Sequence, residues 1–83
     1  MYLMSMGTIF IFRSVKFVIR TNDHNPPHVH IIRGDCEAKI EIKSRRIIRS
    51  MGYSSNDIKR IVKFMEERED LLLEAWYEIH KKD

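Results

Sequence analysis

Cysteine, glycine and proline are scarce in this chain of 83 residues, which has one Cys, three Gly and two Pro. The lone Cys36 excludes an internal disulfide. No run approaches the roughly 18 apolar residues of a membrane-spanning helix, and no charged leader precedes an apolar segment with a small-residue cleavage site. Internal repeats, low-complexity segments and linkers are also lacking. We therefore expect a single domain over residues 1–83, located in the cytoplasm and without membrane contact.

The net charge of +3 is unevenly distributed along the chain. Residues 1–53 carry nine Lys/Arg against four Asp/Glu, whereas residues 54–83 carry six against eight. A basic excess attracts phosphate-bearing partners by electrostatic steering and counterion release. Many basic proteins never bind nucleic acid, so the charge admits RNA as a partner without requiring it.

The first half of the chain consists of short β-branched and aromatic runs separated by Ser, Asn, Asp, Pro and Gly. Four such runs are TIFIFR (8–13), VKFVIR (15–20), HVHIIR (28–33) and CEAKIEI (36–42). Their spacing predicts an antiparallel β-meander of about four strands over residues 8–43. Residues 1–7 form an N-terminal extension in this interpretation.

The register of the last two strands follows from the dipeptide Gly34-Asp35, which suits a two-residue type II′ turn. Arg33 then faces Cys36. A slip of one residue would send every side chain to the other face, and the apolar pattern opposes such a slip.

Counting back from this turn places His30 opposite Lys39 and His28 opposite Glu41. The apolar residues of both strands occupy the other face, and Cys36 joins them as a small, buried residue. We therefore expect the two histidines on a polar face of the sheet, outside the core and away from the helix.

The second half predicts one long amphipathic helix over residues 54–82, after a basic connector at 44–53. Gly52 precedes a Ser54-Ser55 N-cap, and an apolar stripe follows at helical spacing. Glu69 falls within that stripe, so it either pairs inside the seam or marks a break into two helices; the continuous helix is preferred. Packing this helix on one face of the sheet makes the fold α+β.

The stretch DHNPPHVH, residues 23–30, contains three of the four histidines. Its two prolines stiffen the approach to the third strand and hold His24 near His28. His28 and His30, two apart on a strand, project to the same side roughly 6.5 to 7 Å apart.

The histidine cluster supports two chemical hypotheses. In the first, His24, His28 and His30, with Glu41 as a carboxylate, bind zinc or another divalent metal, although Lys39 would oppose the cation. In the second, which needs no cofactor, the three histidines act as acid and base while Lys39 stabilises a phosphate, as in metal-free RNA cleavage.

Two non-catalytic interpretations of these residues are also possible. The histidines can form a wet polar turn without chemistry, so the sequence leaves open whether the protein is an enzyme. Leu72 and Trp76 either close the core or contact a partner, namely a small cognate protein or a second copy that covers edge strands. If they contact a partner, the chain would be a non-catalytic adaptor.

The chain resembles domain of unknown function family 4160 in four motifs. These are HNPPHVH at 24–30, EAKI at 37–40, Gly52-Tyr53-Ser54, and LLLEAW at 71–76. The resemblance covers nearly all of residues 6–83, and Met6-Gly7-Thr8-Ile9 is similar to the Met-Pro-Thr-Ile start of family members. That alignment makes Met6 an alternative start to Met1, with Gly7 departing from the family's proline.

This resemblance implies a small prokaryotic protein, often encoded beside family 2442 in an arrangement similar to toxin–antitoxin cassettes. The expected role is an enzyme-like toxin component whose histidine site handles RNA or another phosphate-bearing ligand, and the alternative is a non-catalytic antitoxin. The resemblance points to His24, His28, His30 and Lys39, together with Asn25-Pro26-Pro27, as the site. It does not imply a particular activity.

Overall fold

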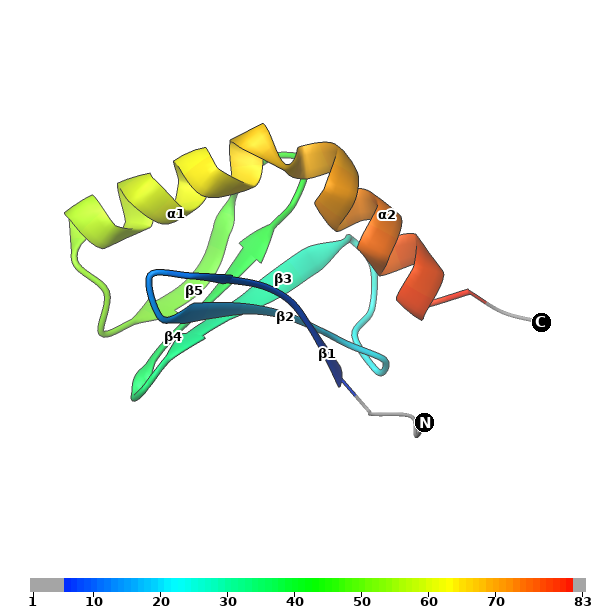
Figure 1. Ribbon diagram of the computed structural model, residues 1–83, viewed down its shortest axis with the longest axis horizontal. Coiled ribbons are helices and arrows are strands. Elements are labelled where there is room, and N and C mark those ends of the chain that lie inside the picture. The colour runs from blue at the N-terminus through cyan, green and yellow to red at the C-terminus, as the bar shows by residue number, and fades with distance from the viewer. Residues whose placement is uncertain (1–5, 82–83) are drawn as a thin grey trace.

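Residues 6–81 are described by the computed structural model, which has an antiparallel five-stranded sheet and two consecutive helices. Both helices cross the same face of the sheet (Figure 1). The elements are β1 (Met6–Phe12), β2 (Val15–Arg20), β3 (His28–Arg33), β4 (Cys36–Glu41), β5 (Ile47–Met51), α1 (Ser55–Glu67) and α2 (Glu69–Ile79). This architecture is the α+β fold predicted from the sequence.

The strands lie side by side in chain order, β1-β2-β3-β4-β5, which is the predicted meander with one strand added. The fifth strand lies in the predicted connector 44–53, where all five of its residues are exposed. Because β5 is an edge strand without a buried face, it lacks the apolar alternation that identifies a strand in a sequence. The sheet also starts earlier than residue 8, since β1 begins at Met6. Residues 1–5 of the predicted extension lie outside the described residues, and so does the choice between Met1 and Met6 as the start.

The predicted register of β3 and β4 is confirmed. Arg33 pairs with Cys36, His30 with Lys39, and His28 with Glu41. Gly34 has a φ of +56°, as the first central position of a type II′ turn requires.

The predicted continuous helix is wrong, because the helical region divides at Arg68 into α1 and α2. Ser54 caps α1, and Asp57 completes a capping box. Arg68 has φ −128° and ψ 26°, outside the helical range. Glu69 was expected either to form a pair or to mark a break in the helix. It does both, because it begins α2 and also pairs with Arg45.

The core lies between the helices and the inner face of the sheet. Leu72 is 0% exposed and Trp76 is 2% exposed, so these two predicted partner contacts instead close the core and offer no surface to another protein. Cys36 is half-buried, and its thiol donates to the carbonyl of Gly52. No helix within residues 6–81 is long and apolar enough to cross a membrane.

Candidate functional site

His28 and His30 meet Asp23 beneath the loop that connects β2 and β3. The two histidines are only 5% and 4% exposed, although they lie on the sheet face opposite the main core residues Val29 and Ile31. The prediction of a solvated histidine face is therefore wrong. The register determined which face the imidazoles occupy, but not that the loop would fold back and cover that face.

One carboxylate oxygen of Asp23 lies close to both imidazoles. Asp23 Oδ1 is 3.1 Å from His30 Nε2 and 3.5 Å from His28 Nε2. The other oxygen, Oδ2, accepts a hydrogen bond of 3.0 Å from the backbone amide of Arg20. The last residue of β2 thus holds the carboxylate in position at the start of the loop.

The hydrogen bonds determine which nitrogen of each ring carries a proton. His28 Nδ1 lies 2.9 Å from the carbonyl oxygen of Pro26, which only accepts, so Nδ1 is the donor and Nε2 keeps a lone pair in the neutral ring. That Nε2 is buried and has no hydrogen-bond partner among the described residues. The loop therefore orients His28 so that its free lone pair points toward Asp23.

His30 is arranged differently. Its Nε2 donates to the Asp23 carboxylate, and its Nδ1 is buried without a hydrogen-bond partner within residues 6–81. Glu37 Oε2 lies 3.9 Å from this Nδ1. His28 and His30 thus each have one buried ring nitrogen without a hydrogen-bond partner, which costs about 1–3 kcal/mol per atom.

The pKa shifts of Asp23 and His30 favour a charged carboxylate beside a neutral imidazole at neutral pH. Burial lowers the pKa of His30 below 6.5, and the Asp23 carboxylate offsets only part of that effect. Burial opposes ionisation of Asp23, but hydrogen bonds from Arg20 and His30 outweigh it and lower the pKa of Asp23 below 3.8. A neutral His30 therefore lies beside an ionised Asp23.

The far end of α2 completes the surroundings of the cluster. The ring centroids of His28 and Trp76 are 5.3 Å apart, so His28 contacts the helix from which it was expected to be distant. Trp76 also stacks on His80, with a centroid separation of 3.8 Å. A hollow of about 460 Å³ lies between this end of α2 and the β2–β3 loop, and Asp23 forms part of its wall.

The remaining predicted site residues lie outside this cluster. His24 is exposed and lines the hollow beside Asp23. Lys39 is half-buried opposite His30, and Glu41 is held by Arg46, whose Nε lies 3.3 Å from Glu41 Oε1. Among the described residues, the three ligand atoms that gather within 4.8 Å belong to Asp23, His28 and His30. The predicted metal set of His24, His28, His30 and Glu41 is thus corrected to two of its members plus Asp23.

Asp23 is the site residue that the sequence interpretation missed. It stands directly before the His-Asn-Pro-Pro run, and a carboxylate next to a histidine cluster is a signal for a shared site. Its contact with His30, seven positions away, depends on how the loop turns, and the peptide bond between Asn25 and Pro26 is cis. The motif does not reveal that path.

The chain belongs to the family described as Domain of unknown function (DUF4160), which matches residues 14–77. This match confirms the family inferred from the motifs and covers every residue of the Asp23, His28 and His30 cluster. Neither the comparison with curated proteins nor the comparison with solved structures found a match. The predicted cognate protein, homo-oligomer and cytoplasmic location stay predictions.

Proposed function

We propose that this protein is a metal-binding domain that holds one divalent transition metal ion, of the zinc class, through Asp23, His28 and His30. The observation that carries the proposal is the buried lone pair on His28 Nε2, which lacks a hydrogen-bond partner and points toward a carboxylate. A coordinated cation satisfies that lone pair, whereas the ionised Asp23 carboxylate beside it only accepts hydrogen bonds and does not.

The separations of the two imidazoles from the carboxylate fit such an ion. Zinc binds imidazole nitrogen and carboxylate oxygen at about 2.0–2.2 Å in tetrahedral geometry, which separates two ligand atoms by roughly 3.3–3.5 Å. The separations from Asp23 Oδ1, 3.1 Å to His30 and 3.5 Å to His28, lie close to that value. A set of two imidazoles and one carboxylate also suits iron and leaves positions open for water or substrate.

The groups around the three residues would orient them as ligands. The Pro26 carbonyl fixes His28 by its Nδ1, and the Arg20 amide fixes Asp23 by its Oδ2. His30 would bind through Nε2 after moving its proton to Nδ1, which faces Glu37 Oε2 at 3.9 Å. The bond that His28 Nδ1 donates to Pro26 raises the basicity of His28 as a ligand, and outer hydrogen bonds of this kind are usual around metal-binding histidines.

The burial of the site weighs against the metal-free hypothesis. Acid–base catalysis on RNA requires imidazole nitrogens that reach the substrate, yet His28 and His30 are at most 5% exposed. Asp23, in the wall of the hollow, instead gives small ligands a route toward a bound ion. The cluster also gains a compensating positive charge on metal binding, because Asp23 is ionised and His30 is neutral.

The test is cobalt and zinc titration of chelator-treated protein, with Co²⁺ absorption bands reporting nitrogen and oxygen coordination. We expect one ion per chain for the wild type and a loss of affinity of about 10-fold or more for His28→Gln or Asp23→Asn. His24→Gln is the matched control, since His24 is exposed in the same loop. Equal affinities for His24→Gln and His28→Gln, or no binding by the folded wild type, would contradict the proposal; circular dichroism checks that each variant is folded.

A further inference from the structure

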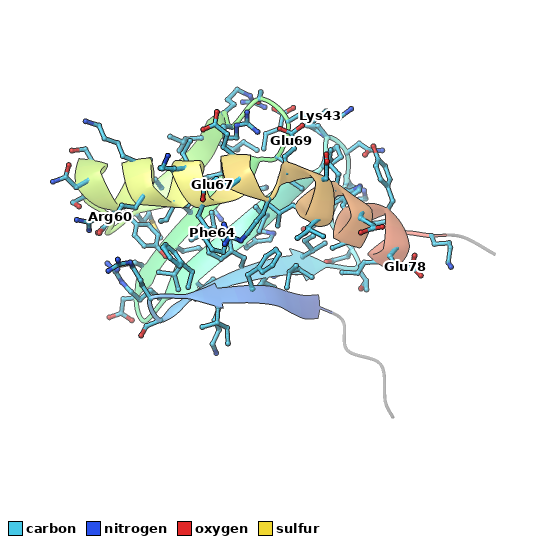
Figure 2. All side chains as sticks on the ribbon, turned by 45° about the horizontal axis from the view of Figure 1, so that its top comes forward. Lys43, Arg60, Phe64, Glu67, Glu69 and Glu78 are labelled. Carbon is cyan, nitrogen blue, oxygen red and sulfur yellow. The ribbon has the colours of Figure 1, made fainter. Side chains whose placement is uncertain are left out.

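The β1–β2 turn lies beneath α1, at the other end of β2 from the histidine loop (Figure 1). Residues of this turn and of α1 line a basic groove. It consists of two adjoining hollows of about 270 and 190 Å³ that share Phe12, Arg13 and Arg60 in their walls. Figure 2 shows Phe64 between α1 and the strands below it, and this residue also lines the larger hollow. The shared walls make the two hollows one extended groove.

The walls of this groove concentrate positive charge. Five cations line it, namely Arg13, Arg33, Arg60, Lys63 and Arg68. Two carboxylates, Asp57 and Glu67, lie among them, so the groove carries +3, which equals the net charge of the whole chain. Charge gathered along one groove is the electrostatic footprint of a polyanion site.

Two of the five arginine and lysine side chains keep their charge uncompensated. Asp57 pairs with Arg33 at 3.2 Å, and Glu67 lies 3.6 Å from Lys63 and 3.4 Å from Arg68. No ion pair found within residues 6–81 involves Arg13 or Arg60. These two residues belong to both hollows, so the uncompensated charge lies at the centre of the groove.

Aromatic rings lie beside these cations. Phe12 and Phe64 stack with a centroid separation of 4.4 Å, and Phe12 is only partly buried. The guanidinium carbon of Arg13 lies 5.5 Å from the Phe12 ring centre, and that of Arg68 lies 3.9 Å from the Phe64 ring centre. A guanidinium held against a ring offers a flat surface on which a base can stack, while its N–H groups remain free for phosphate.

We propose that this basic groove binds single-stranded nucleic acid, with Arg13 and Arg60 contacting the phosphate backbone and the Phe12 and Arg13 surface stacking a base. An alternation of cations and aromatic surface along a groove is how proteins bind single strands without reading their sequence. An anionic membrane is a poorer fit, because the two phenyl rings line a groove and do not project from the surface as an apolar wedge. The groove is separate from the metal site, so either proposal can fail alone.

The test uses fluorescence anisotropy with a labelled oligouridylate of about ten nucleotides. About three net phosphate contacts predict that the affinity of the wild type falls roughly tenfold or more between about 50 and about 200 mM salt. The double variant Arg13→Gln, Arg60→Gln should bind about tenfold more weakly than the wild type at the lower salt, with a smaller salt dependence. Phe12→Leu, which keeps an apolar side chain, should weaken binding about fivefold or more if a base stacks there.

The matched control is the double variant Lys43→Gln, Lys59→Gln. This variant has the same net charge as the Arg13→Gln, Arg60→Gln variant. Both lysines are exposed and absent from the walls of the groove. The control should keep the wild-type affinity within about twofold, because its phosphate contacts are intact. Equal losses in the two double variants, no binding by the folded wild type, or tighter binding to phosphatidylserine vesicles than to the oligonucleotide would overturn the proposal.

Discussion

Asp23 Oδ1 accepts a hydrogen bond from His30 Nε2 at 3.1 Å, joining the β2–β3 loop to the middle of β3 across seven positions of sequence. This contact holds Asp23 beside both buried imidazoles of the candidate metal site. Under the proposed function, stability and metal binding therefore depend on the same three side chains.

Acidification should destabilise the metal-free protein. The pKa of His30 in the folded protein is below 6.5, so the unfolded chain binds more protons as the pH falls through that value. The free energy of unfolding should accordingly decrease on going from about pH 7.5 to about pH 5.5. Asp23, whose pKa is below 3.8, adds a further loss only at still lower pH. The measurement is the urea midpoint of chelator-treated protein at the two pH values.

Two variants separate His30 from the other titrating groups. His30→Asn should show a smaller change of midpoint between the two pH values, because the group that prefers its neutral form is gone. His24→Asn should behave as the wild type, since His24 is exposed. Identical pH dependence in the wild type and in His30→Asn would contradict this interpretation.

Truncation of Leu72 should be far more costly than truncation of its neighbour. Leu72 is 0% exposed in the core, whereas Leu71 is 53% exposed. We expect Leu72→Ala to lower the free energy of unfolding by about 2–5 kcal/mol and Leu71→Ala by at most about 0.5 kcal/mol. Urea unfolding followed by circular dichroism measures both. A large effect of Leu71→Ala on stability would show that this side chain is buried in an assembly of several chains.

Replacement of Gly52 by alanine should destabilise the protein more than the same replacement at Gly34. Both have positive φ, +87° and +56°, which costs an alanine about 1–2 kcal/mol. At Gly52 the added Cβ would also lie 2.8 Å from Cys36 Sγ and 3.2 Å from Cys36 Cα, whereas at Gly34 it meets nothing within 4 Å. The crowding should cost Gly52→Ala about 1–3 kcal/mol more. Thermal unfolding of the two variants compares them, and equal melting temperatures would show that the β5 end moves away freely.

The ion pair between Arg45 and Glu69 should couple the β4–β5 connection to the start of α2. Figure 2 shows Glu69 close to this connection, near Lys43. The two side chains are 22% and 34% exposed, whereas Lys63 and Glu67 of another pair are 74% and 55% exposed. A double-mutant cycle with glutamine substitutions should give a coupling of roughly 0.5–1 kcal/mol for Arg45 with Glu69, and about 0.3–0.5 kcal/mol for the exposed pair. Equal couplings would mean that solvent screens both pairs alike.

Local rules were sufficient for several parts of this fold. The Gly34-Asp35 turn and the alternation on either side of it determined all the pairings of β3 with β4, because one residue of slip exchanges the two faces. The apolar stripe determined which side of the helices meets the sheet, and Ser54 with Asp57 determined where α1 begins. The HNPPHVH motif identified both the family and two of the three members of the candidate metal site.

Tertiary contacts decided the rest. β5 pairs through its backbone along β4 and buries no side chain, so its sequence carries little strand signal. The division of the helix at Arg68 accompanies the pairing of Glu69 with Arg45, a residue 24 positions away in the chain. The alternation along β3 predicts which face its histidines occupy. Their burial depends on what packs against that face, and the β2–β3 loop and the end of α2 cover it only in the folded protein. The order of residues therefore indicated where the candidate site lies. Its third member, Asp23, and the burial of its histidines arise from contacts between segments that lie apart in the chain.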